Sequence, residues 1–287
     1  MIAIIGAEGF IGSHFSRYLQ KVEVEHLRVT RSNPLIDVDG ALAPDFRTNS
    51  ALTIYWLASS SVPAVVEQRP SIIHLEVEYF RKCLTELRRY QPESRIVLLS
   101  SASVVYASDT KPCVEDTPLA PFNQYGNLKV SLENVLESSE LDYMILRVTN
   151  AYGPGQRSGR GQGVIAEWLG SARENRPLLL FGDENSTRDY VHITDVTRAM
   201  TLLLTNWLPN EVVNIGSGKS ISLRDLLVLV ESVVGRNLIV ESRDSRVVDR
   251  AFSAVDIAKA ISRLSWVPQV GLHEGIQSWW ELINSES

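Results

Sequence analysis

Short apolar runs alternate with amphipathic stretches through the first 150 residues of the chain. The runs are rich in β-branched residues, and their lengths fit strands that are buried on both faces of a sheet. Between them, hydrophobic residues recur at helical spacing, most clearly over residues 72–90 and 124–136. This alternation predicts βαβ units and a parallel sheet. We predict its strands at residues 2–5, 27–30, 52–57, 95–100 and 143–148.

The pattern changes near residue 150, where a loop rich in glycine and proline occupies residues 152–156. Beyond it, strands and helices no longer alternate regularly, which is typical of an α+β region. We predict one domain over residues 1–150 and a second, smaller one mainly over 151–287, with the chain returning to the first domain at about 187–216. Helices are predicted in the second half at residues 163–174, 222–234, 253–264 and 272–284.

Composition and charge argue against several classes of protein. The 287 residues are 44% hydrophobic and carry a net charge of −6, unlike the basic surface of a nucleic-acid-binding protein. The apolar runs are too short to span a membrane, and the first residues lack the features of a signal peptide. Two cysteines are too few for a disulfide framework, and the five histidines lack the spacing of metal ligands. We expect a cytoplasmic, metal-free protein that binds neither nucleic acid nor membrane.

Three glycines mark a turn between the first predicted strand and an amphipathic helix. Gly6, Gly9 and Gly12 are spaced three residues apart. Glycine permits the positive φ and the close backbone approach that such a turn needs. The N-terminus of the following helix offers free N–H groups and the positive end of its dipole to a pyrophosphate. The context predicts a site for a nicotinamide dinucleotide, and the alternative is a plain glycine-rich turn.

The end of the second predicted strand bears on which dinucleotide binds. An acidic residue at this point usually holds the ribose hydroxyls of NAD. Here the segment is Thr30-Arg31-Ser32. Two hydroxyls and a guanidinium suit a 2′-phosphate, which a carboxylate would repel. The segment predicts a preference for NADP, with NAD as the alternative, unless Arg31 is only an exposed arginine on a surface turn.

Tyr125 and Lys129 stand at positions i and i+4 of a predicted helix, so they share one face. A free phenol titrates near pH ~10 and is a poor base at neutral pH. A lysine ammonium and a cationic nicotinamide ring would both favour the phenolate form. The pair therefore predicts proton transfer by Tyr125 beside a nicotinamide, with Lys129 as its partner.

Several linked motifs occur in a fixed order along the chain. Besides the glycine turn and the Tyr125–Lys129 pair, they include residues 100–106, 146–155, 188–192 and 213–218. Together they resemble the extended short-chain dehydrogenase/reductases, specifically the NAD(P)-dependent nucleotide-sugar epimerase/dehydratase family with its UDP-glucose 4-epimerases. The resemblance covers essentially the whole chain. It implies an α/β fold with a Rossmann-type doubly wound parallel sheet and a smaller α+β substrate domain, and a homodimer formed through the helices at 72–90 and 124–136.

The resemblance also assigns residues to two ligands, a dinucleotide and the nucleoside-diphosphate sugar that lies between the domains. Besides the residues already named, it assigns to the cofactor Glu8, Phe10, Ile11, Leu57, Ala58, Ser59 and Val148. It assigns to the substrate Asn150, Arg188 and Arg246 at the diphosphate, and Val164, Leu180 and Phe181 beside the nucleobase.

The chain departs from the family pattern close to the predicted catalytic pair. Family members usually carry Ser or Thr four residues before the tyrosine that is Tyr106 here, and its hydroxyl shares a proton with the catalytic tyrosine. This chain has Ala102 at that position. The neighbours Ser101 and Ser103 are the candidates to replace the hydroxyl, although both point away from the face of Ala102 on a regular strand.

Two other departures concern acids and amides. The acids that dehydratases use in elimination are replaced by Ser103 and Val104, which makes a dehydratase the least favoured reading. An asparagine that contacts the cofactor side in the family is missing near Val77. Glu67 and Glu78 are expected to face solvent.

The sequence leaves three functions open. The first two share one geometry, in which Tyr125 exchanges a proton with a hexose hydroxyl, most simply at C4, while hydride moves to or from the nicotinamide. A 4-epimerase does this in both directions on a retained NAD, whereas a 4-keto reductase consumes NADPH. The third is a dinucleotide-binding regulator without turnover, which Ala102 and the missing asparagine favour and the Tyr125–Lys129 pair disfavours.

Overall fold

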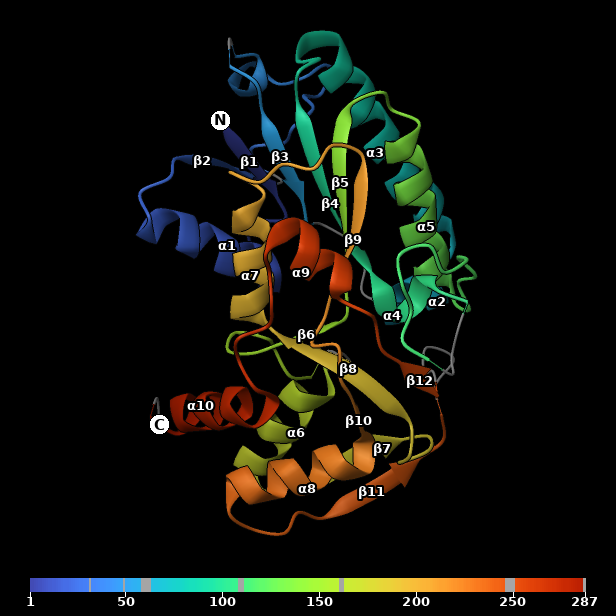
Figure 1. Ribbon diagram of the computed structural model, residues 1–287, viewed down its shortest axis with the longest axis vertical. Coiled ribbons are helices and arrows are strands. Elements are labelled where there is room, and N and C mark those ends of the chain that lie inside the picture. The colour runs from blue at the N-terminus through green and yellow to red at the C-terminus, as the bar shows by residue number, and fades with distance from the viewer. Residues whose placement is uncertain are drawn as a thin grey trace.

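The computed structural model describes residues 1–30, 32–48, 50–57, 63–107, 111–159, 163–245 and 251–285. Its largest sheet has six parallel strands in the order β2-β1-β3-β4-β5-β9 (Figure 1). Central strands such as β1 and β4 carry runs of consecutive apolar residues, because both faces of this sheet are covered by helices. The strands are β1 (Ile2–Ile5), β2 (His26–Val29), β3 (Thr53–Trp56), β4 (Arg95–Ser101), β5 (Asp142–Val148) and β9 (Glu211–Ile215).

Successive residues of each strand point into two different cores. On one face, Ile54 and Ile96 pack with Phe80 and Leu132 of the covering helices. The neighbouring strand residues, such as Val97, pack on the other face. The first face is covered by α2 (Pro63–Gln68), α3 (Ser71–Tyr90) and α5 (Gln124–Glu137), and the second by α1 (Phe10–Lys21), α7 (Ile193–Leu202) and α9 (Ala258–Leu264).

The predicted fold class is confirmed, because the doubly wound parallel sheet is accompanied by a smaller α+β unit. All five predicted strands of the large sheet are present. The sixth strand, β9, and the helices α7 and α9 come from the second half of the chain. The chain therefore returns to the large sheet after leaving it at the end of β5. The domain boundary near residue 150 stays a prediction.

The smaller unit lies below the large sheet in Figure 1. Strand β8 (Thr187–His192) is its centre and pairs with three short strands. A core that includes Trp168 and Trp279 binds its helices together. The other elements are β6 (Asn150–Tyr152), β7 (Leu178–Phe181), β10 (Ser220–Ser222), β11 (Val240–Arg243), β12 (Phe252–Ser253), α6 (Val164–Arg173), α8 (Leu223–Val234) and α10 (Leu272–Ser285).

The helix predicted over residues 253–264 is wrong at its start. Phe252 and Ser253 form β12, which pairs with β8. The helix α9 begins only at Ala258, whose N–H donates to Asp256 Oδ1 at 2.7 Å. It packs on the large sheet through Ala260 and not in the smaller unit.

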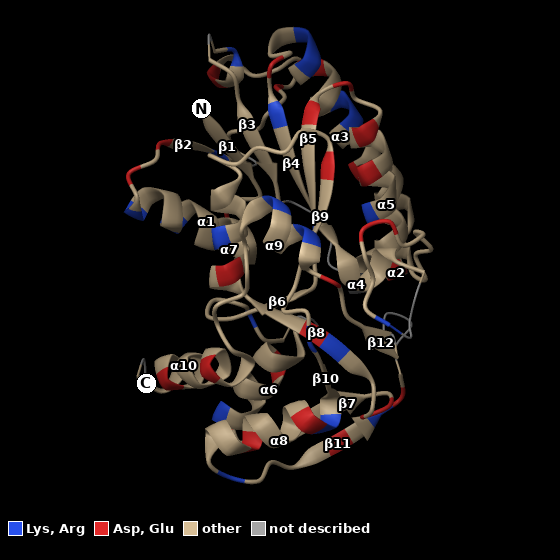
Figure 2. Ribbon diagram, viewed as in Figure 1, with Lys and Arg blue, Asp and Glu red and all other residues tan. Residues whose placement is uncertain are grey.

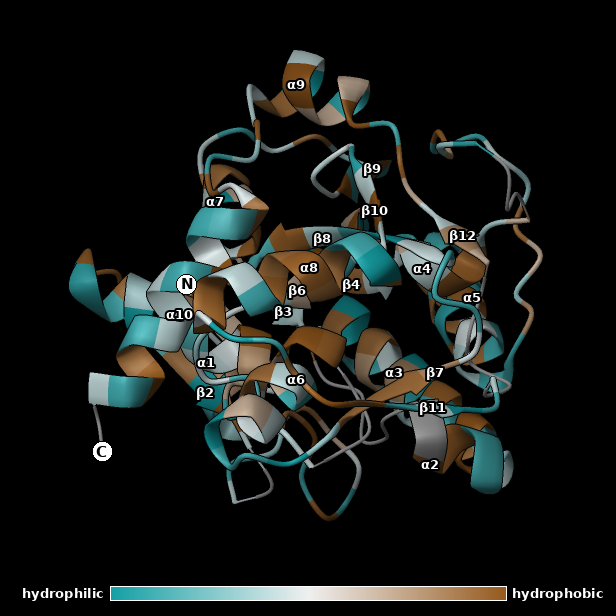
Figure 3. Cartoon of the chain, turned by 90° about the horizontal axis from the view of Figure 1, so that it is seen from below, coloured by the Kyte–Doolittle hydropathy of each residue, from teal (hydrophilic) through white to brown (hydrophobic). Residues whose placement is uncertain are grey.

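Charged residues of both signs are interspersed over the elements visible in Figure 2. Helices that cover the sheets, such as α8, carry hydrophobic and hydrophilic residues on the same turns (Figure 3). Among the described helices, none is both long and apolar enough to cross a membrane.

Candidate active site

The glycine turn joins β1 to α1 at the carboxyl edge of the large sheet. Gly6 has a φ of +86°, and the Gly9 N–H donates to Gly6 O at 3.0 Å. A Cβ at position 12 would overlap Gly6 O, so only glycine lets α1 lie this close to the turn. No side chain caps α1 at Gly9, which leaves the first N–H groups of the helix available to an anion. The turn fits the pyrophosphate of a dinucleotide.

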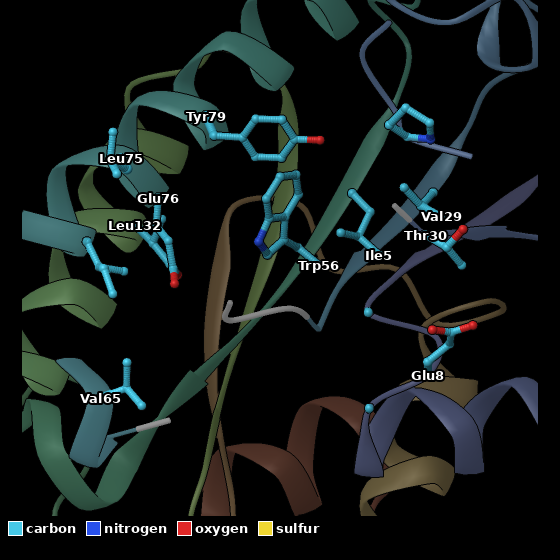
Figure 4. A pocket seen from close by; sticks show the side chains of 14 residues that line it. Ile5, Glu8, Val29, Thr30, Trp56, Val65, Leu75, Glu76, Tyr79 and Leu132 are labelled. Atoms are coloured by element: carbon cyan, nitrogen blue, oxygen red, sulfur yellow. The ribbon is translucent and has the colours of Figure 1, made fainter. Parts of the chain in front are cut away.

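A crevice lies beside this turn. The strands β2 and β3 flank β1, and the helices that follow β1 and β3 cover opposite faces of the sheet. Ligands of open α/β sheets bind at such a switch point. A pocket of about 740 Å³ occupies it, with Ile5, Trp56, Tyr79 and Leu132 among its apolar walls (Figure 4). A pocket of this size with apolar walls suits the planar rings of a dinucleotide.

We call the part of this cleft beside Gly6, Glu8 and Thr30 the glycine-turn end. The Thr30 hydroxyl lies 3.0 Å from the Ser32 hydroxyl and accepts from the Asn33 N–H at 3.2 Å, which fixes a tight turn after β2. Glu8 and Thr30 both line the pocket. The Glu8 carboxylate is 74% exposed and lies 3.9 Å from an Arg28 guanidinium nitrogen. Arg31 lies outside the described residues.

The part of the cleft that helix α5 lines through Leu132 is called the α5 end. Tyr125 and Lys129 belong to the same helix but are not among the residues that line the pocket. The Lys129 ammonium lies 5.5 Å from the centre of the Tyr125 ring. Lys129 is only 6% exposed, and its Nζ donates to Leu99 O of β4 at 3.0 Å. The helix begins at a side-chain cap, because Asn123 Oδ1 accepts from the Gly126 N–H at 2.7 Å. The predicted pair therefore lies on one helix face, anchored to the sheet by the lysine.

Glu67 does not face solvent freely, which corrects the expectation from the sequence. It is half-buried on α2, and its Oε1 accepts from the Gln124 N–H at 2.7 Å and from the Tyr125 N–H at 3.4 Å. Glu78 is exposed, as expected, and pairs with Arg81. The sequence held no signal for the Glu67 contact, since the two segments are more than fifty residues apart.

The strand end at the missing hydroxyl is irregular. β4 ends at Ser101, and Ala102 begins α4 (Ala102–Val105), a single helical turn. The Ser103 hydroxyl is buried, with no hydrogen-bond partner among the described residues. Ser101 is half-buried at the carboxyl end of the strand. Ser103 is also half-buried as a whole residue, so both candidates keep some exposure at this strand end.

A buried polar network lies beneath the α5 end, and the sequence analysis missed it. Arg147 of β5 pairs with Glu133 of α5 at 2.6 Å, and the Ser100 hydroxyl donates to Glu133. Arg147 also donates to the Tyr106 hydroxyl at 3.2 Å, and that hydroxyl donates to Asn214 of β9 at 2.5 Å. Burial raises the pKa of Tyr106 to about 12. Two features of the sequence could have revealed this network: the arginine within an apolar strand, and the glutamate one helical turn beyond Lys129.

Other residues predicted for the cofactor flank the same edge of the sheet. Near Val77, where the family has an asparagine, Val77 packs on the core and Glu76 lines the pocket. Ala58 and Ser59 lie outside the described residues. Phe10 and Ile11 form the first turn of α1, Leu57 directly follows β3, and Val148 ends β5.

The residues predicted for the substrate lie on the smaller unit. Asn150 and Arg188 stand on the paired strands β6 and β8, and the Asn150 amide donates to Asp189 O at 2.8 Å. Tyr190, which the sequence analysis did not single out, lies two residues further along β8 on the same face as Arg188. Its buried hydroxyl has no hydrogen-bond partner among the described residues. Arg246 lies outside those residues.

The three residues predicted beside the nucleobase lie in α6 and β7. Val164 begins α6 directly after Gly163, whose φ is +75°. Leu180 is buried in the core of the smaller unit, and Phe181 is half-buried at the end of β7. Leu180 is therefore part of the smaller unit's core, and Val164 packs against that core.

A glycine turn at a switch point and a tyrosine–lysine pair on a helix that borders the cleft are the arrangement expected of a dinucleotide-binding α/β protein. The model of the NAD dependent epimerase/dehydratase family matches residues 2–216. The chain belongs to this family.

Similar proteins include epimerases and a reductase. A putative UDP-glucose 4-epimerase of Methanocaldococcus jannaschii is 30% identical, over 96% of each chain. A dTDP-4-dehydro-6-deoxyglucose reductase of Escherichia coli is 31% identical over 78% of this chain and 72% of its own length. Among solved structures, the UDP-glucose 4-epimerase of Thermotoga maritima with UDP-glucose is 25% identical, with a TM-score of 0.87 and 99% of each chain covered. MoeE5 in complex with UDP-glucose and NAD has the same identity and TM-score, over 100% of this chain and 99% of its own.

Proposed function

We propose that this chain is a nucleotide-sugar 4-epimerase that uses NAD. The observation that carries the proposal is helix α5 at the border of the cleft, where Lys129 is anchored to the sheet one turn from Tyr125. The relatives named above as epimerases, one of them solved with UDP-glucose, support a hexose attached to a nucleoside diphosphate as substrate.

In this proposal the residues of α5 and β4 carry out the chemistry, and residues of the smaller unit bind the substrate. Tyr125 accepts the proton of the C4 hydroxyl and later returns it, and the Lys129 ammonium stabilises the phenolate. A bound nicotinamide supplies the hydride acceptor and donor. Ser101 is proposed to bond the sugar oxygen in place of the hydroxyl missing at Ala102. On the smaller unit, Arg188, Asn150 and Arg246 are proposed to bind the diphosphate, whose charge suits guanidinium groups.

A second candidate is a 4-keto reductase that consumes NADPH. It is favoured by the relative named as a reductase and by the hydroxyls of Thr30 and Ser32, with Arg31 between them. The Glu8 carboxylate favours NAD instead, because it lines the same end of the pocket and would repel the 2′-phosphate of NADP. The predicted NADP preference is therefore tied to the reductase, and NAD to the epimerase.

The family resemblance also leads us to propose a homodimer through α3 and α5, which lie side by side in Figure 1. Light scattering of the purified protein tests it. A mass of twice 32.0 kDa is expected, and a mass of 32.0 kDa at micromolar concentration would exclude a stable dimer.

One experiment separates the two reactions. The purified protein is incubated with UDP-glucose in the absence of added cofactor, and in parallel with dTDP-4-dehydro-6-deoxyglucose and NADPH. The epimerase predicts an NMR-visible change of configuration at C4 in the first reaction and no loss of NADPH absorbance in the second. Loss of absorbance with no conversion of UDP-glucose would establish the reductase. Turnover in neither reaction would contradict both for these substrates.

A further inference from the structure

Helix α5 begins with four N–H groups that no turn of the helix can satisfy. Two of these groups, on Gln124 and Tyr125, donate to one carboxylate oxygen of Glu67, at 2.7 and 3.4 Å. The third donates to the capping Asn123 side chain. The main-chain nitrogen of the predicted catalytic tyrosine is thus held by a side chain from another element.

The acid is placed where its charge acts most strongly. A carboxylate at a helix N-terminus interacts with the positive end of the helix dipole, and hydrogen bonds to an ionised acceptor are about twice as strong as neutral ones. Glu67 is half-buried and forms no ion pair with another described residue, so the α5 N-terminus is its main partner.

The element that carries Glu67 also borders the cofactor cleft. Val65 of α2 lines the pocket, and α2 packs against both α3 and α5. One short helix therefore contacts the cofactor site through Val65 and the catalytic helix through Glu67. A shift of α5 relative to this wall would move the Tyr125 hydroxyl relative to a bound nicotinamide.

We propose that Glu67 is a positioning residue for Tyr125, acting through the two hydrogen bonds to the first turn of α5. The expected fall in kcat rests on the proposed function with its hydride transfer. The support that Glu67 gives to the first turn of α5 does not depend on it. Because an error of ~1 Å in a catalytic group can cost about 100-fold in rate, removing this support should lower kcat and leave KM almost unchanged.

The test compares Glu67→Ala, Glu67→Gln and a matched control. The control is Glu231→Ala, which removes another half-buried carboxylate that accepts a backbone N–H, from Leu238 at 2.8 Å, in α8 far from the cleft. For Glu67→Ala we expect kcat to fall at least about tenfold, with KM and the cofactor Kd changed less than about twofold. Glu67→Gln keeps an acceptor and should retain kcat within about threefold.

Hydrogen exchange of the amides of Gln124 and Tyr125 gives a readout that needs no turnover. It should speed up in Glu67→Ala and stay unchanged in Glu231→Ala. Unchanged exchange, or a kcat for Glu67→Ala no lower than that of the control, would overturn the proposal, as would a Glu67→Gln variant as slow as Glu67→Ala. If the wild type turns over none of the substrates, the proposed function fails, while the exchange result still decides the role of Glu67.

Discussion

The α5 end of the cleft and its glycine-turn end lie on the same edge of the sheet but differ in how their polar groups are held. Beside the α5 end, Lys129 is 6% exposed and is bonded to β4, and the helix start is held by Asn123 and Glu67. At the glycine-turn end, the Glu8 side chain is 74% exposed, and its ion pair within the described part of the chain is a 3.9 Å contact to Arg28.

Under the proposed function, this difference would separate the residues for chemistry from those for cofactor choice. Proton transfer needs donor and acceptor within a fraction of an ångström of the right position, so we expect groups that perform it to be held by packing and hydrogen bonds. Discrimination between NAD and NADP needs only a charge near the ribose, which an exposed side chain supplies. Changes at the α5 end should therefore affect turnover and stability, and changes at the other end should affect cofactor preference alone.

The largest effect is expected for Tyr125→Phe. Removing the hydroxyl abolishes the proton transfer and should lower kcat about 10³-fold, within the range for general acid–base groups. Fluorescence titration should show cofactor binding changed less than about twofold, because the ring remains. Turnover of this variant at more than a tenth of the wild-type rate would contradict the role given to Tyr125.

Glu133→Gln should have the next largest effect, on stability. The substitution leaves Arg147 charged and unpaired in the core, where breaking a buried ion pair costs about 3–5 kcal/mol. Urea unfolding measures it. The matched control is Glu241→Gln, which breaks the exposed pair with Arg243 and should cost less than about 1 kcal/mol. An equal loss of unfolding free energy in the two variants would mean that the buried Glu133–Arg147 pair adds no more stability than an exposed one.

Glu8→Gln tests the glycine-turn end. Removing the carboxylate should raise the affinity for NADP relative to NAD about tenfold at low ionic strength, which corresponds to ~1.4 kcal/mol, and less in salt. Isothermal titration of both cofactors to wild type and variant measures the ratio, and kcat should not change. An unaltered ratio would remove Glu8 from the choice of cofactor.

The smallest effects concern the two serines beside Ala102. Ser103→Ala should leave kcat within about twofold and be neutral to stabilising, since it removes a buried hydroxyl that has no partner among the described residues. Ser101→Ala should lower kcat about tenfold if its hydroxyl bonds the sugar oxygen. The reverse pattern would move the missing hydroxyl to Ser103.

Much of the fold followed from the sequence because strands of a doubly covered sheet form short, mostly apolar runs. The glycine turn followed from the spacing of the glycines, since any other residue at position 12 would place a Cβ atom on Gly6 O. The error at 253–264 arose because pairing of Phe252 with β8 is decided by a tertiary contact.

The supports of the site could not be read from the sequence for the same reason. Glu67 contacts Gln124, and Glu133 contacts Arg147, only after the sheet has brought their helices and strands together. Local pattern shows that an acid lies on a helix, but not which N–H or guanidinium it will face.

The most direct test of the central claim traces deuterium between the sugar and the nicotinamide. UDP-glucose labelled with deuterium at C4 is incubated with the protein and its bound cofactor in ordinary water, and both are examined by mass spectrometry and NMR. The account predicts deuterium on the nicotinamide of trapped enzyme and deuterium retained at C4 of the epimerised sugar, with neither seen in Tyr125→Phe. Epimerised product that has lost its label to water would show that no hydride moves between C4 and the nicotinamide, and would contradict the account.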